Sequence, residues 1–349
     1  MLSFAVAMGQ SGGAISGHFG SMVAHRPEIL NLLTGHAWGL EGNIYWNASG
    51  EAQWHHFYNL PQRGIDVHFT DLGNPEELGQ QFSISPYIKL RLNTTSRKLN
   101  QYIKLGMGAG YTTKTWDLET NVKGLVIGSS FNAALHIQYV LNGNINEKMR
   151  WNAGVRIMHF SNGSFQLPNL GTNNLTLFTG LQIGQPSLKL RMDDYKWEEG
   201  SEMMMGKDQA ISYEFGFREN FPPGGPKHAV HTIRYQLRKK FSNKSSWMAI
   251  ADASYNRSLK PLLIRDKVFE GNDDLFQFGL VGGYGLHFGK TSFDMMMGVY
   301  LVNTYSDRGP LYHRFGLTHQ LKRNWYGTMM LKTHFAKADH LAIGIQRYL

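Results

Sequence analysis

Apolar and polar residues alternate along most of the chain, which is the two-residue period of a strand with two different faces. Between Trp151 and Ile157 every second residue is apolar, with asparagine, glycine and arginine between them. The pattern recurs from Ile15 to Ile345, separated by turn-forming residues. It predicts an all-β fold of about 14–16 antiparallel strands.

The polar rows are rich in lysine, arginine, glutamine, histidine, asparagine and glycine. In a soluble sandwich the apolar rows face a core, whereas in a membrane barrel they face lipid and the polar rows face the lumen. Short and long connections alternate, as in outer-membrane barrels. Aromatic residues gather near strand ends, as in interfacial girdles: Trp38, Trp46, Trp151, Trp247, Trp325, Tyr111 and Tyr255. We therefore expect an antiparallel transmembrane β-barrel.

One polar stretch, Gln185–Asp208, interrupts the series of strands. We expect residues 13–349 to form a single outer-membrane barrel, although this stretch could also be a boundary between two smaller barrels. Residues 1–12 resemble the end of a trimmed secretory signal, because Leu2–Met8 is apolar and small but no basic segment precedes it. Export to the outer membrane of a bacterium is the expected location.

The composition limits the classes of molecule that the protein is expected to bind. The 349 residues carry a formal charge of +9, have a mean hydropathy of −0.33 and include no cysteine, so disulfides and thiolate metal sites are excluded. A basic chain favours anionic partners, either nucleic acid or a phosphate-bearing lipid surface. No helix-turn-helix or zinc-finger spacing is present, so we expect a lipid surface and no nucleic acid. We expect no cofactor and no metal.

Three polar residues, His159, Ser161 and Asn173, lie on the apolar rows of two successive predicted strands. Polar groups on an apolar face are unfavourable for stability alone. A serine hydroxyl becomes a nucleophile when an imidazole takes its proton and a third group fixes the imidazole tautomer. The three residues therefore predict an esterase site, with a hydrogen-bonded polar cluster beneath a loop as the alternative.

The motifs around these residues resemble a known family. His159-x-Ser161-Asn162, Pro168-Asn169-x-Gly171 and Asn173 are similar to the lipid A 3-O-deacylase (PagL) family of outer-membrane acyloxyacyl hydrolases. Gly39-Leu40-Glu41, Tyr58–Gly64 and Asp71–Gly79 extend the similarity upstream. The resemblance covers roughly residues 14–185, whereas residues 186–349 show no specific motif and are expected to add strands.

The resemblance implies that the protein removes an ester-linked 3-hydroxyacyl chain from lipid A of lipopolysaccharide. It implies Ser161 as nucleophile, His159 as base and Asn162 as a contributor to the oxyanion hole, together with backbone groups near Gly163. Better-known members carry glutamate where this chain has Asn173. Whether the protein forms a homodimer stays open.

Two alternatives remain. The His-x-Ser-Asn-Gly pattern also resembles outer membrane phospholipase A, whose triad is Ser-His-Asn and which binds calcium through an acidic loop. The segment Gly163–Thr172 contains no aspartate or glutamate, so phospholipase ranks second. The third hypothesis for the function is a non-catalytic barrel or pore.

Overall fold

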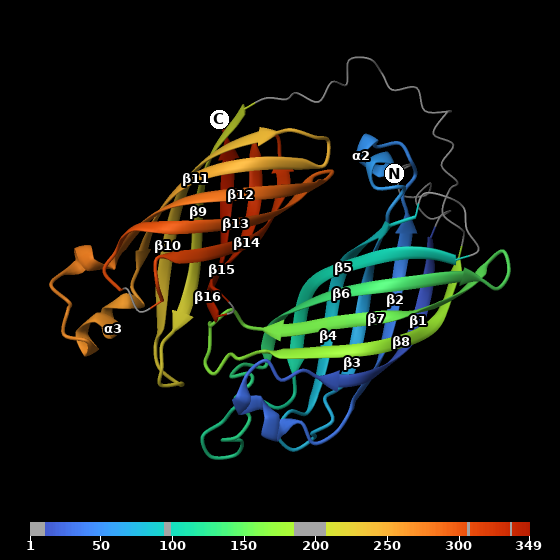
Figure 1. The fold of residues 1–349 in the computed structure, drawn as a ribbon, viewed down its shortest axis with the longest axis horizontal. Coiled ribbons are helices and arrows are strands. Elements are labelled where there is room, and N and C mark those ends of the chain that lie inside the picture. Colours follow the sequence, from blue (N-terminus) through green and yellow to red (C-terminus); the bar gives the residue numbers. More distant parts are fainter. Residues whose placement is uncertain (1–10, 94–98, 185–206, 306–307, 336) are drawn as a thin grey trace. The chain divides into compact units, whose positions relative to one another are not determined.

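The computed structural model of the protein describes residues 11–93, 99–184, 207–305, 308–335 and 337–349. Within these residues sixteen strands form two closed antiparallel barrels of eight strands each (Figure 1). The all-β antiparallel barrel class and the strand number are as the alternation predicts. Among the described residues, no helix is long and apolar enough to cross a membrane.

The first barrel closes because β8 pairs with β1 as well as with β7. Two short helices, η2 (Pro27–Leu32) and α2 (Gln53–Phe57), lie in its connections. Its strands are β1 (Ser11–Met22), β2 (Ala37–Asn47), β3 (Gln62–Asp71), β4 (Gln80–Arg91), β5 (Leu99–Thr112), β6 (Phe131–Asn144), β7 (Met149–Ser161) and β8 (Thr172–Gly184).

The second barrel closes where β16 pairs with β9. The helices α3 (Leu259–Arg265) and η4 (Asn272–Leu275) lie between β11 and β12. Its strands are β9 (Lys207–Glu219), β10 (Lys227–Lys240), β11 (Ser245–Asn256), β12 (Phe276–Phe288), β13 (Thr291–Asn303), β14 (Leu311–Lys322), β15 (Trp325–His334) and β16 (Lys337–Tyr348).

The expectation of a single barrel over residues 13–349 was wrong. The strands close after β8 and again after β16, so the polar stretch between them is the boundary that the alternative reading allowed. Alternation shows which face each residue takes but not which strands close a sheet, and this explains the error. Ser11 and Gly12 belong to β1 rather than to a signal remnant, whereas residues 1–10 lie outside the described part of the chain.

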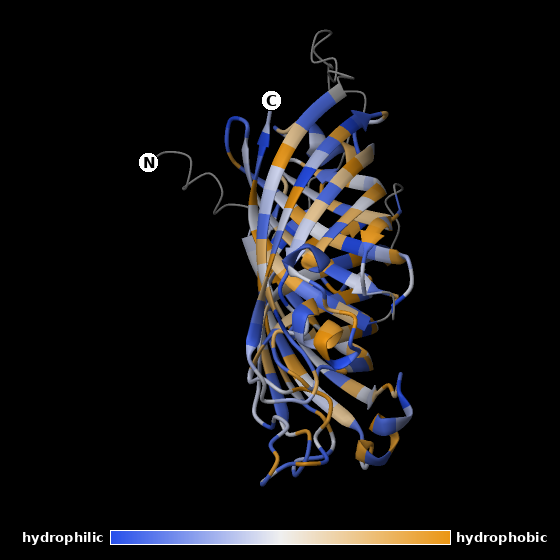
Figure 2. Cartoon of the chain, turned by 90° about the vertical axis from the view of Figure 1, so that its left-hand side faces the viewer, coloured by the Kyte–Doolittle hydropathy of each residue, from blue (hydrophilic) through white to orange (hydrophobic). Residues whose placement is uncertain are grey.

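The alternation in sequence becomes an apolar outside and a polar inside in both barrels, and Figure 2 shows it as alternating colours along the strands. Trp151, Val155 and Ile157 of β7 are exposed, while Asn152 and Arg156 between them are buried. The second barrel also has an exposed apolar row, and its buried interior combines charged side chains with an apolar cluster: Met248, Ile250, Val281, Met296, Tyr312 and Met330. An eight-stranded barrel is only wide enough for side chains to fill it.

Four connections gather at the end of the first barrel where β7 finishes: residues 23–36, 72–79, 113–130 and 162–171. Apolar side chains from these connections form a small core over this end of the barrel. Its buried members are Met22, Ile29, Leu32, Leu72, Leu78 and Val126, with Leu170 packed against them. This core gives the loop that follows Ser161 a fixed support.

Candidate active site

The hairpin of β7 and β8 places His159 directly opposite Asn173. The imidazole Nδ1 of His159 lies 2.8 Å from the Oδ1 of Asn173. Both side chains continue the outward rows of their strands, next to Ile157 and Leu175, which are exposed. The predicted pairing across the hairpin is therefore confirmed, and the pair lies on the outer wall of the barrel instead of in its lumen.

Ser161 is the last residue of β7 and shares this outward row with His159. Its hydroxyl forms two hydrogen bonds with the side-chain amide of Asn169. The Ser161 Oγ donates to Asn169 Oδ1 at 3.2 Å, and the Asn169 Nδ2 donates to Ser161 Oγ at 3.0 Å. A serine hydroxyl and an imidazole thus share one face of a strand, with the Asn169 amide hydrogen-bonded to the hydroxyl.

Asn162 begins the connection to β8, and its side chain is buried. Its Nδ2 donates to Ser129 Oγ at 2.7 Å, and its backbone N–H donates to Asn169 Oδ1 at 3.0 Å. Gly163, the next residue, has φ +63°, a left-handed conformation that suits glycine. The structure therefore brings the Asn169 amide to the Ser161 hydroxyl, while the Asn162 amide bonds to the neighbouring loop.

The loop 113–130 supports this connection from the side. Asn169 forms an isolated β-bridge with Ile127, and the Gly171 N–H donates to the Val126 carbonyl at 2.8 Å. Gly171 also has φ +78°, and a Cβ there would lie 2.9 Å from His159 Cε1. Only glycine lets the chain turn so close to the imidazole.

A second histidine reaches the group from the β1–η2 connection. The Asn173 Nδ2 lies 2.8 Å from His25 Nδ1, and His25 Nε2 lies 2.9 Å from the Leu170 carbonyl oxygen. Sequence reasoning did not find His25 or Asn169. Asn169 belongs to the Pro168-Asn169-x-Gly171 motif, but the motif alone did not indicate a role for its side chain. His25 carries no local signal, because its contact spans 148 residues of sequence.

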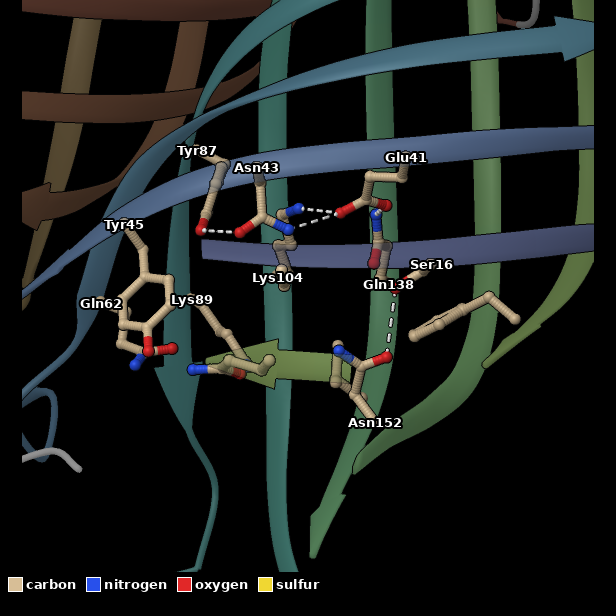
Figure 3. Close-up of a pocket in the computed structure, with 14 residues that line it drawn as sticks. Ser16, Glu41, Asn43, Tyr45, Gln62, Tyr87, Lys89, Lys104, Gln138 and Asn152 are labelled. Atoms are coloured by element: carbon tan, nitrogen blue, oxygen red, sulfur yellow. Dashed lines mark hydrogen bonds and ion pairs between the residues drawn. The ribbon is translucent and has the colours of Figure 1, made fainter. Parts of the chain in front are cut away.

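A second cluster of titratable side chains lies in the lumen of the first barrel. Its carboxylates are Glu41 and Asp66, and Lys104 Nζ lies 2.6 Å from Glu41 Oε1 and 2.8 Å from Asp66 Oδ2. Three buried histidines surround them: His18, His68 and His136. Figure 3 shows Lys104 and Glu41 at a cavity of about 20 Å³, which has room for about one water molecule.

Two groups in this lumen have ligand atoms within 4.8 Å of one another, as a metal site requires: His18, Glu41 and His68, and Asp66, His68 and His136. The donor set argues for a different role. The ammonium of Lys104 already bridges both carboxylates, and the Arg156 guanidinium donates to His68 Nδ1 at 2.8 Å. We therefore infer that the cluster fills the lumen with charged side chains that form ion pairs with one another.

Comparison with known proteins agrees with the motifs. Residues 40–182 match the family model of lipid A 3-O-deacylase (PagL), and residues 203–348 match the model of the acyloxyacyl hydrolase C-terminal domain. No curated protein gives a significant match.

Two solved structures illustrate the structural matches. The crystal structure of the outer membrane enzyme PagL is 18% identical, covers 49% of this chain and 98% of its own, and has a TM-score of 0.35. A triple mutant of Rhodopseudomonas blastica porin is 8% identical, covers 97% of this chain and 99% of its own, and has a TM-score of 0.18. With the deacylase model on the first barrel and the C-terminal-domain model on the second, the chain belongs to the lipid A 3-O-deacylase (PagL) family of acyloxyacyl hydrolases.

Proposed function

We propose that the protein is an outer-membrane serine esterase that removes an ester-linked 3-hydroxyacyl chain from lipid A of lipopolysaccharide. The observation that carries the proposal is the placement of Ser161, His159 and Asn173 on the lipid-facing wall at one end of the first barrel. A substrate that lies in the membrane reaches such a site sideways, so no deep pocket is needed. The bacterial outer membrane, in its outer leaflet, is the compartment that supplies this substrate.

His159 is the general base in this proposal. Its Nδ1–H donates to Asn173 Oδ1, which leaves the Nε2 lone pair to accept the Ser161 proton once the hydroxyl turns from Asn169 Oδ1 toward the imidazole. The Ser161 oxygen attacks the ester carbonyl, and the tetrahedral intermediate collapses as the sugar oxygen leaves with the proton from His159. Water then attacks the acyl-serine by the same route in reverse, which releases the fatty acid and restores the serine.

The negative charge that develops on the carbonyl oxygen needs hydrogen-bond donors. We assign one of them to the Asn169 Nδ2, because it already donates to the Ser161 Oγ at which the intermediate forms. Backbone N–H groups in the turn at Gly163 are the further candidates, since this turn follows Ser161 directly. Asn162 is the residue that holds Asn169, through its backbone N–H.

The pore alternative does not fit the interiors of the barrels. In the first barrel the Glu41, Asp66 and Lys104 cluster crosses the lumen. In the second, Arg234 and Arg314 pair with Glu214 in the same way. Eight-stranded barrels filled by paired charged side chains leave no aqueous channel.

The decisive experiment uses purified lipopolysaccharide and the full-length protein in detergent. Mass spectrometry of lipid A should show loss of a 3-hydroxy fatty acid with the parent protein and no loss with Ser161→Ala or His159→Ala. Ser21→Ala is a matched control, because Ser21 is an exposed serine of the same barrel whose hydroxyl lies 3.0 Å from the Nδ1 of a different histidine, His36.

Retained release by either site variant would refute the assignment. Calcium-dependent release of fatty acid from glycerophospholipid, with lipid A untouched, would favour the phospholipase reading instead. Circular dichroism of each variant should keep the strand signal of the parent protein, so that a loss of activity is not a loss of fold.

A further inference from the structure

The amide of Asn173 is different at its two ends, and its orientation decides what His159 can do. An amide oxygen only accepts hydrogen bonds and an amide nitrogen only donates them. With Oδ1 toward His159, the imidazole must carry its proton on Nδ1 and keep a lone pair on Nε2. With the amide turned over, Nδ2 would face His159 Nδ1, the proton would move to Nε2, and the base would be lost.

A chain of contacts fixes one of the two orientations. The Leu170 carbonyl oxygen can only accept, so His25 carries its proton on Nε2, which lies 2.9 Å away. The neutral ring then has its lone pair on Nδ1, which accepts from the Asn173 Nδ2 at 2.8 Å. Asn173 Oδ1 is left facing His159 Nδ1.

We propose that His25 is a positioning residue for the reaction, which transmits the direction of the Leu170 carbonyl to the tautomer of His159 through the amide of Asn173. The inference rests on the proposed esterase function. It also explains how a neutral amide serves as the third member of the site, because an amide works there only when an outside group fixes its orientation.

Several contacts hold His25 near Asn173. The residue follows the end of β1, and the backbone N–H of Val23 donates to the Asn173 carbonyl at 2.7 Å. Leu170, which accepts from His25, packs against the apolar core over this end of the barrel. The histidine ring is thus held between two segments whose backbones are themselves fixed.

The test compares His25→Ala in two backgrounds, the parent chain and Asn173→Asp. In the parent chain, loss of one hydrogen bond lets the amide turn over, and kcat should fall by about five- to tenfold with KM unchanged. In the Asn173→Asp background both carboxylate oxygens accept, so orientation does not matter and His25→Ala should change kcat by less than about twofold. His25→Gln offers an acceptor oxygen in place of the ring and should restore most of the activity of the parent chain.

His36→Ala is the matched control. His36 lies in the same connection between β1 and β2 as His25, but its ring contacts Ser21 and takes no part in the chain of contacts from Leu170 to His159. Equal losses in both backgrounds would mean that His25 only supports the fold and would overturn the inference, as would full activity of His25→Ala in the parent chain. Ser161→Ala is measured in parallel, because activity that survives this change defeats the esterase assignment itself and not merely the role of His25.

A second measurement decides the matter if the Asn173→Asp protein has no activity. Nitrogen NMR of histidine-labelled protein distinguishes a ring protonated on Nδ1 from one protonated on Nε2. His159 should be the Nδ1–H tautomer in the parent protein and a mixture of both tautomers in His25→Ala. An unchanged tautomer in the variant would overturn the inference.

Discussion

His159 and Asn173 face each other across the β7–β8 hairpin, with the imidazole Nδ1 2.8 Å from the amide Oδ1, and both lie on the outer wall of the first barrel. This relationship joins the strand register to the chemistry. A slip of one residue between β7 and β8 would turn one side chain of the pair into the lumen. The closed sheet of the first barrel therefore maintains the tautomer that the proposed reaction needs.

Replacing Asn173 by alanine should lower kcat by roughly 10- to 100-fold, because the imidazole loses the acceptor that selects its tautomer. This fall in kcat is smaller than the fall expected on removing a carboxylate partner, because a neutral amide does not stabilise the charge of the imidazolium. Steady-state release of fatty acid from lipopolysaccharide measures the effect. Thr179→Ala changes an exposed polar residue of β8 and should leave kcat within about twofold; a similar fall there would point to disruption of the hairpin.

Asn169→Ala should reduce turnover by about 10²- to 10³-fold, the usual effect of losing an oxyanion donor. Asn169→Asp keeps the size of the side chain but cannot donate, so it should lose about as much activity. Asn146→Ala is the control, because Asn146 caps the turn at the other end of the β6–β7 hairpin. Activity close to that of the parent in Asn169→Asp would show that this side chain only holds the loop.

Gly171→Ala should lower turnover by about 10²-fold, because the new methyl group would lie 2.9 Å from His159 Cε1 and displace the ring. Gly50→Ala is a matched control: Gly50 also has a positive φ, +85°, but its Cβ would find its nearest neighbour at 3.7 Å. Both changes should cost about 1 kcal/mol of stability through backbone strain. Urea unfolding and turnover measured on both proteins separate strain from displacement, and equal turnover in both would contradict the prediction.

Lys104→Met should destabilise the first barrel by about 3–5 kcal/mol, because Glu41 and Asp66 would remain buried without their shared cation. Lys89→Met is the comparison. Lys89 is also buried, but its ammonium bonds to neutral oxygens of Asn142 and Gln182, so its loss should cost only about 1–3 kcal/mol. Unfolding in denaturant from detergent micelles measures both. Equal costs would mean that the carboxylates do not depend on Lys104.

The strands, their two faces and the row that His159, Ser161 and Asn173 share could all be predicted from the alternation of apolar and polar residues. A period of two is a local property, so it survives into the barrel, where Trp151 faces outward and Arg156 inward as the alternation predicts. The hairpin pairing of His159 with Asn173 was also within reach, because the two residues are only 14 positions apart.

Where the sheets close and which residues surround the site could not be predicted from the sequence and became visible in the folded chain. Closure of β8 on β1 depends on pairings between strands more than 150 residues apart, and the alternation is the same in one large barrel or two small ones. Asn169 reaches Ser161 through a left-handed turn after Asn162, and His25 arrives from a distant loop. A local sequence pattern cannot predict such contacts, because residues that are far apart in sequence come together only when the whole sheet has closed.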